Sequence, residues 1–123
     1  MHLITNASDV YDNRGFGKWL KTDYTGDWYF YAGDKAMSVL TGMNKGFLSG
    51  GWYKVEWQNK EDWYNFDSSG VMRSGWYNEN DKIYYLIGDR NNTFFGKMVT
   101  GTQVIDGETY QFDNNGVLVG KGR

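Results

Sequence analysis

The chain contains no cysteine and no proline. The first absence excludes a disulfide framework and a thiolate metal site, and the second excludes polyproline linkers and collagen-like helices. No apolar run approaches the ~18 residues that a membrane span needs, so we expect no membrane span. The first ten residues, MHLITNASDV, also lack the basic end and the apolar stretch of a secretory signal peptide.

Positive charge is neither in excess nor clustered. The 13 Lys and Arg residues are outnumbered by 15 Asp and Glu residues, which gives a net charge of −2. A protein that binds nucleic acid or an anionic membrane usually carries a basic patch. We therefore expect neither nucleic acid nor membrane as a partner.

Residues suited to catalysis are scarce as well. The only histidine is His2, beside the terminus, so Ser-His-Asp and Cys-His arrangements have no suitable base. No Gly-rich phosphate loop occurs. The acidic residues could supply a carboxylate pair for glycoside hydrolysis, but most of them lie beside Gly, Asn or Ser, where they are typical of turns. We predict a protein that is not an enzyme and that uses no metal and no cofactor.

Branched aliphatic residues are few, and aromatic residues take their place. Of 123 residues, 23 are Trp, Tyr or Phe, whereas Leu, Ile and Val together number 18 and Ala only 3. So few Ala and Leu leave little for amphipathic helices, whereas aromatic residues and Val and Thr favour strands. The length allows one domain or a short array of small units.

Two linked motifs recur along the chain, and such recurrence is the signature of a repeat protein. The first motif is glycine-rich and occurs as GFLSGGW at 46–52, GVMRSGW at 70–76, GKMVTGT at 96–102 and a shortened GVLVG at 116–120. The second is aromatic and precedes each copy, as WYFY at 28–31, WYNF at 63–66, IYYL at 83–86 and TYQF at 109–112. We predict an N-terminal segment 1–18 and a repeat domain 19–123, with units 19–51, 52–75, 76–101 and 102–121.

Each unit is typical of a β-hairpin followed by a connecting loop. In the last unit, Asp106-Gly107 separates two short strand-like segments and is a strong hairpin signal. Further turns are predicted near 23–27, 58–62 and 79–81, and loop insertions at 32–45 and 89–95. An isolated hairpin is marginal in water, but four hairpins in series bury a continuous seam. The predicted fold class is therefore all-β, a β-solenoid of stacked β-hairpin repeats.

Strand alternation divides the aromatic motif into two columns, because successive residues face opposite sides. The second and fourth positions are apolar or aromatic in every copy, so we predict that they form the core. The first and third positions change from aromatic to polar along the chain, which favours a ligand-binding surface. That column comprises Trp28, Phe30, Trp63, Asn65, Ile83, Tyr85, Thr109 and Gln111.

Three aromatic residues in this arrangement are candidates for one site. Trp52 opens the second unit, Trp63 lies in its outward column, and Tyr85 lies in the same column of the next hairpin. Met72 lies on the connection between these hairpins. An aromatic cage of this kind attracts a quaternary ammonium ion through the ring quadrupoles, by about 0.5–2 kcal/mol per ring, and Met adds a polarizable surface. Structural packing is the alternative for each of these aromatic residues.

The coupled GxMxxGW and WYxF motifs over residues 19–121 resemble the choline-binding or cell-wall-binding repeats of Gram-positive surface proteins and of bacterial and phage lytic enzymes. The resemblance implies a hairpin solenoid that binds choline of teichoic acids between consecutive repeats. It assigns the cage to Trp52, Trp63, Met72 and Tyr85, with Tyr84 in place of Tyr85 if the face assignment is shifted by one residue. It also implies an extracellular, cell-wall-associated module, which could be the targeting module of a larger cell-wall hydrolase.

The other junctions between units depart from this pattern, and their residues are weaker candidates. The first has Trp19 and Trp28 but meets Asn65 where a third aromatic residue is needed. Its Met position holds Leu48, with Met37 and Met43 as substitutes in the insertion. The third has Trp76 and Met98, together with Ile83 and Gln111.

Two other functions stay open. The last unit resembles an end cap or a sugar-binding variant, because YQFDNNGVL is similar to the glucan-binding repeats of bacterial glucansucrases and to clostridial toxin repeats. A carbohydrate-binding module for glucan or a cell-surface glycan is thus the alternative to choline binding. A hydrolase would need a convergent carboxylate pair in a cleft. Aromatic-rich terminal hairpins can also pair between subunits, and the resemblance implies that some relatives form homodimers in this way.

Overall fold

The computed structural model describes residues 18–22, 25–31, 47–57 and 60–121. These residues form strands and turns, with no helix among them, so the prediction of an all-β chain is confirmed for this part of the sequence. Nor do the same ranges hold a helix long and apolar enough to cross a membrane. His2, Met37 and Met43 lie outside the described residues, as does the insertion at 32–45.

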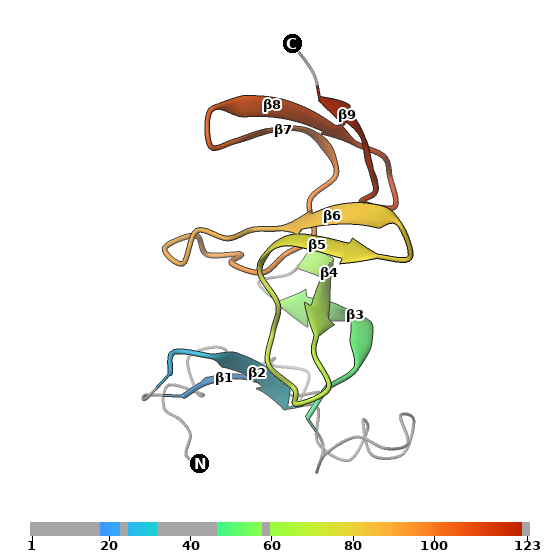
Figure 1. Ribbon diagram of the computed structural model, residues 1–123. Coiled ribbons are helices and arrows are strands. Elements are labelled where there is room, and N and C mark those ends of the chain that lie inside the picture. The colour runs from blue at the N-terminus through green and yellow to red at the C-terminus, as the bar shows by residue number, and fades with distance from the viewer. Residues whose placement is uncertain (1–17, 23–24, 32–46, 58–59, 122–123) are drawn as a thin grey trace. The chain divides into compact units, whose positions relative to one another are not determined.

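The chain divides into two compact units, residues 1–72 and 73–123. The first unit contains two antiparallel hairpins (Figure 1): β1 (Lys18–Lys21) pairs with β2 (Trp28–Tyr31), and β3 (Gly51–Trp57) pairs with β4 (Lys60–Phe66). Its buried apolar side chains are Trp19, Phe30, Leu48, Val55, Tyr64, Phe66 and Met72.

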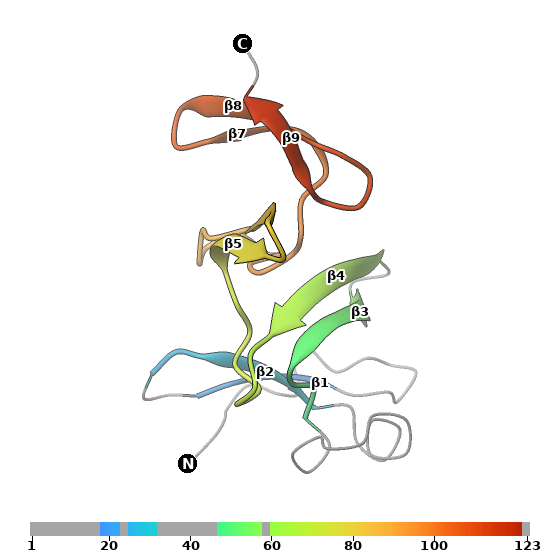
Figure 2. The ribbon, with the colours of Figure 1, turned by 45° about the vertical axis from the view of Figure 1, so that its right-hand side comes forward.

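The second unit also contains two hairpins, and a third strand extends the last one (Figure 2). β5 (Gly75–Glu79) pairs with β6 (Lys82–Leu86), and β7 (Gly101–Ile105) pairs with β8 (Glu108–Phe112). β9 (Leu118–Lys121) lies along the other side of β8. Val99, Ile105 and Phe112 form a buried cluster, against which Tyr85, Ile87, Tyr110 and Leu118 pack.

Local turn chemistry explains why the hairpins of the second unit form where they do. The loop between β5 and β6 has Asn80 and Asp81 at φ 54° and 67°, and the loop between β7 and β8 has Asp106 and Gly107 at φ 51° and 83°. Positive φ at both central residues is the geometry of the hairpin turn whose twist matches the flanking strands, and Asn, Asp and Gly tolerate it best. The predicted turns near 79–81 and at 106–107 are thus confirmed.

Aspartates organise the bends that follow two of the hairpins. The Asp67 carboxylate accepts hydrogen bonds from the backbone N–H groups of Ser69 and Val71, both at 2.9 Å. The Asp113 carboxylate accepts equivalent bonds from Asn115 and Val117, also at 2.9 Å. These carboxylates satisfy backbone donors, which confirms the predicted turn role of acidic residues beside Asn and Ser.

The predicted division of the aromatic motif into a core column and an outward column is partly wrong. Phe66, Leu86 and Phe112, at the fourth position, are buried as predicted. However, Phe30 and Asn65 occupy the predicted outward column and are only 5% and 1% exposed. In the first unit, side chains at the third position of the motif are therefore buried as well, and this position contributes to the core.

Candidate functional site: aromatic faces of the hairpins

The strand register places the opening tryptophan of a hairpin and the first residue of its aromatic motif on the same face. In the hairpin of β3 and β4, Trp52 pairs with Asn65 and Lys54 pairs with Trp63. Residues two apart on a strand share a face, so Trp52 and Trp63 lie on one side of this hairpin. Trp63 is 40% exposed and Trp52 is half-buried. The predicted grouping of these two tryptophans is thus consistent with the register.

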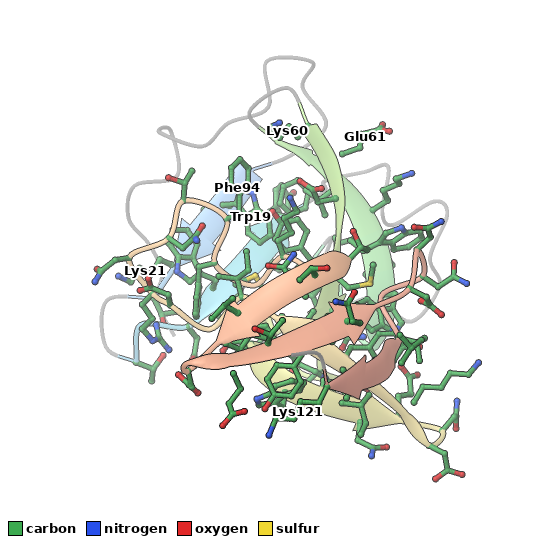
Figure 3. The ribbon with its side chains drawn as sticks, turned by 90° about the horizontal axis from the view of Figure 1, so that it is seen from above. Trp19, Lys21, Lys60, Glu61, Phe94 and Lys121 are labelled. Atoms are coloured by element: carbon green, nitrogen blue, oxygen red, sulfur yellow. The ribbon has the colours of Figure 1, made fainter. Side chains whose placement is uncertain are left out.

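In the first unit, Trp19 is the centre of a cluster of rings. Trp19 belongs to β1, as does Lys21 (Figure 3). Its ring centroid lies 5.0 Å from those of Phe30 and Tyr64, both edge-on, and 6.0 Å from that of Phe66, which is stacked. Trp28 adds a further edge contact at 6.3 Å. Trp19 is only 5% exposed, so this ring contributes mainly to packing.

In the second unit, Trp76 is the centre of a cluster of the same design. Its ring centroid lies 5.0 Å from that of Tyr85 and 4.9 Å from that of Tyr110, with interplanar angles of 62° and 70°. Phe112 stacks at 6.0 Å and 29°. The difference from the first unit is exposure: Trp76 is 43% exposed and its tyrosine neighbours are half-buried. Trp76 therefore offers aromatic surface to a ligand, whereas Trp19 does not.

In both clusters, the tryptophan ring contacts a tyrosine of the following hairpin. The partners are Tyr64 and Tyr110, at the second position of the aromatic motif, and not Asn65 and Gln111 at the third position. The predicted lack of a third aromatic residue opposite Trp19 is therefore wrong. A signal for the correct assignment is present in the sequence, because the second position is the only one that is Tyr in all four copies.

The four residues of the predicted cage divide between the two units. Trp52, Trp63 and Met72 belong to residues 1–72, and Tyr85 belongs to residues 73–123. Within its own unit, the Tyr85 ring packs against the Trp76 ring. On the other face of the same hairpin, the ring centroids of Tyr84 and Tyr77 are 6.4 Å apart. The cage of Trp52, Trp63, Met72 and either tyrosine stays a prediction.

The methionines of the glycine-rich motif lie in the core. Met72 and Met98 are 7% and 9% exposed, and each bridges to the last residue of the preceding aromatic motif, Phe66 and Leu86. Gly116 lies directly on Met98: a Cβ added there would overlap Met98 Sδ and stand 2.7 Å from Met98 Cε. The methionine side chains thus contribute to the apolar core.

The positive charge at two of these faces comes from lysines, and the buried Tyr64 phenol behind one of them is neutral. Lys21 Nζ lies 5.8 Å from the ring centroid of Trp28, and Lys54 Nζ lies 5.8 Å from that of Trp63. Burial, with a smaller contribution from Asp62, raises the pKa of the Tyr64 phenol, which stays neutral. In the described ranges, no three His, Cys, Asp or Glu side chains group as metal ligands.

Neither a family model nor a curated protein matches this sequence. Solved structures do match, and among them are choline-binding proteins and modular endolysins, one of them complexed with choline. These matches confirm the resemblance to the choline-binding repeat family that the linked motifs indicated.

Three particular structures illustrate the likeness. Choline binding protein F from Streptococcus pneumoniae is 28% identical, with a TM-score of 0.61 over 82% of this chain and 27% of that chain. The modular Cpl-1 endolysin, complexed with a peptidoglycan analogue, is 28% identical, with a TM-score of 0.60 over 85% of this chain and 25% of that chain. The pneumococcal cell wall endolysin from phage Cp-1, complexed with choline, is 23% identical, with a TM-score of 0.59 over 96% and 27%, and shares the fold. The present chain spans about a quarter of the length of these proteins.

Proposed function

We propose that this chain is a non-catalytic binding module that attaches to choline-containing teichoic acid of a bacterial cell wall. The observation that carries the proposal is the exposed Trp76 ring with two tyrosine rings edge-on to it at 5.0 and 4.9 Å. The likeness to choline-binding proteins adds support, because the structures at 28% identity include a choline-binding protein.

The chemistry of this cluster suits a quaternary ammonium ion. The methyl groups of choline donate no conventional hydrogen bonds, so carboxylates or amides give little selectivity for them. Aromatic faces attract the cation through their quadrupoles and the methyl groups through dispersion, by about 0.5–2 kcal/mol per ring. The exposed Trp63 beside Trp52 supplies a second face of this type in the first unit.

The wider assembly follows as part of the same proposal. We take the four hairpins to be a β-solenoid within a repeat domain of residues 19–123, preceded by segment 1–18. The module would then be extracellular and cell-wall associated, either as a homodimer or as the targeting part of a larger cell-wall hydrolase.

A carbohydrate-binding function is the second candidate, and one feature of the last hairpin favours it. There Thr102 and Gln111 occupy the positions of the aromatic pairs Trp19–Phe30 and Trp76–Tyr85 of the first and third hairpins. Their side chains form an exposed hydrogen bond of 3.0 Å. Such a polar pair can bind sugar hydroxyl groups through hydrogen bonds. The half-buried Tyr110 ring lies on the other face of this hairpin, where it pairs with Gln103 and offers a surface on which a sugar ring can stack.

Cosedimentation with cell walls distinguishes these functions. We expect the chain to sediment with walls whose teichoic acid carries choline and not with walls of the same strain grown to carry ethanolamine instead. Free choline should release the bound protein, and glucan oligosaccharides should not. Equal binding to both walls, with release by oligosaccharides alone, would contradict the choline proposal and support the second candidate.

A further inference from the structure

Lysine faces the aromatic motif in the two hairpins of the first unit, and only where that motif begins with tryptophan. Lys21 pairs with Trp28 and Lys54 pairs with Trp63. At the same position in the second unit the pairs change together, to Asn78 with Ile83 and Val104 with Thr109. In these four hairpins, lysine therefore occurs at this position only where its strand partner is tryptophan.

The two lysine side chains take up the same place relative to their rings. Each Nζ atom lies 5.8 Å from the centroid of its tryptophan ring, and both lysine residues are exposed. This distance is close to the ~6 Å outer limit of a cation–π contact. Among the described residues, no carboxylate forms an ion pair with either lysine. Each tryptophan therefore has a positive charge held over its ring.

A positive charge at this position changes which ligand the ring prefers. A free ammonium ion that approaches Trp63 meets the like charge of Lys54, which weakens binding. A ligand that carries an anionic group close to its ammonium avoids this cost, because the anion can pair with the lysine while the ammonium contacts the ring. In phosphocholine only two carbon atoms separate the ammonium nitrogen from the phosphate ester oxygen, so one molecule can span both partners.

We propose that Lys21 and Lys54 make the first unit selective for zwitterionic ligands of the phosphocholine type over free choline. This inference rests on the proposed function, since it specifies the form in which the quaternary ammonium is bound. A purely structural role is the competing explanation, because cross-strand pairs of lysine and tryptophan also stabilise hairpins. A structural role would change affinity for both ligands in the same direction, whereas a selective role changes the two affinities in opposite directions.

Calorimetric titration of the full chain with phosphocholine and with choline separates these roles. We expect the unaltered chain to bind phosphocholine about threefold more tightly, the size of effect that an exposed ion pair gives. In the double variant Lys21→Met and Lys54→Met, phosphocholine should bind more weakly and choline more tightly, so that the preference disappears. The double variant Lys21→Arg and Lys54→Arg should retain the preference, and added salt should reduce it.

Lys82→Met is the matched control, because Lys82 is also exposed on a hairpin strand but lies opposite Glu79 in the strand register, and not opposite a tryptophan. It should leave the preference unchanged. A preference that survives in the double Met variant overturns the inference while leaving the proposed function intact. Binding of inorganic phosphate alone, lost in the same variant, would show a simple anion site and would also overturn it. If neither choline nor phosphocholine binds the unaltered chain, the inference and the proposed function fail together.

Discussion

Tyr64 shows how one residue serves the core and not the binding surface. Its side chain is 2% exposed, and its ring lies edge-on to that of Trp19 at 5.0 Å. The neighbouring residue on the same strand, Trp63, points to the other side and is 40% exposed. Two adjacent aromatic residues of one motif therefore have separate roles, because strand alternation sends them to opposite faces.

Truncation of these neighbours should separate stability from binding. Tyr64→Ala removes a buried ring that contacts Trp19, so we expect a loss of about 3 kcal/mol or more in the free energy of unfolding. Trp63→Ala should cost less than about 1 kcal/mol, because much of its surface is already in water. Urea denaturation followed by circular dichroism measures both. Equal losses in the two variants would contradict the assignment of their faces.

At the scale of the element, the hairpins could largely be predicted because their determinants are local. Asn80, Asp81 and Asp106-Gly107 adopt the positive φ angles that their turns require, and sequence alone identifies such residues. The bends at Asp67 and Asp113 follow from side-chain hydrogen bonds over two to four residues. Local chemistry of this kind is visible in a single sequence.

The features that could not be predicted depend on contacts between elements. Alternation yields two columns, but it does not say which positions of a column the next elements cover. For this reason the prediction that Phe30 and Asn65 belong to a ligand-binding surface is wrong, because both are buried. Strand β9 was not predicted either, because its short sequence becomes a strand only by pairing with β8. Lys121 on β9 supports that pairing through an ion pair of 2.9 Å with Glu108.

Gly116 allows a test of how the glycine-rich motif packs on a hairpin. It combines a φ of +85° with direct contact to Met98. Gly116→Ala should therefore destabilise the chain by about 2–4 kcal/mol, from backbone strain and overpacking together. Gly107→Ala is the control, because Gly107 has a similar φ of +83° but nothing within 4 Å of the added Cβ. If the two variants have the same urea midpoint, the contact with Met98 adds no destabilisation, which would contradict this prediction.

At the scale of the whole molecule, the two units repeat one design with different exposure. Trp19 and Trp76 have matching ring neighbours at matching distances, yet Trp19 is 5% exposed and Trp76 is 43% exposed. The same fold thus provides a packed cluster in one unit and an accessible one in the other. The number of ligand sites should accordingly be smaller than the number of hairpins.

Titration with choline, followed by intrinsic tryptophan fluorescence, tests the central claim most directly. Because each ring contributes about 0.5–2 kcal/mol, a small cation on two or three rings should bind with a Kd of about a millimolar, equivalent to about −4 kcal/mol. We predict a saturable change in fluorescence in that range, reduced in Trp76→Ala and absent with potassium chloride at equal ionic strength. Fluorescence that stays unchanged far above a millimolar of choline would contradict choline binding by these aromatic faces.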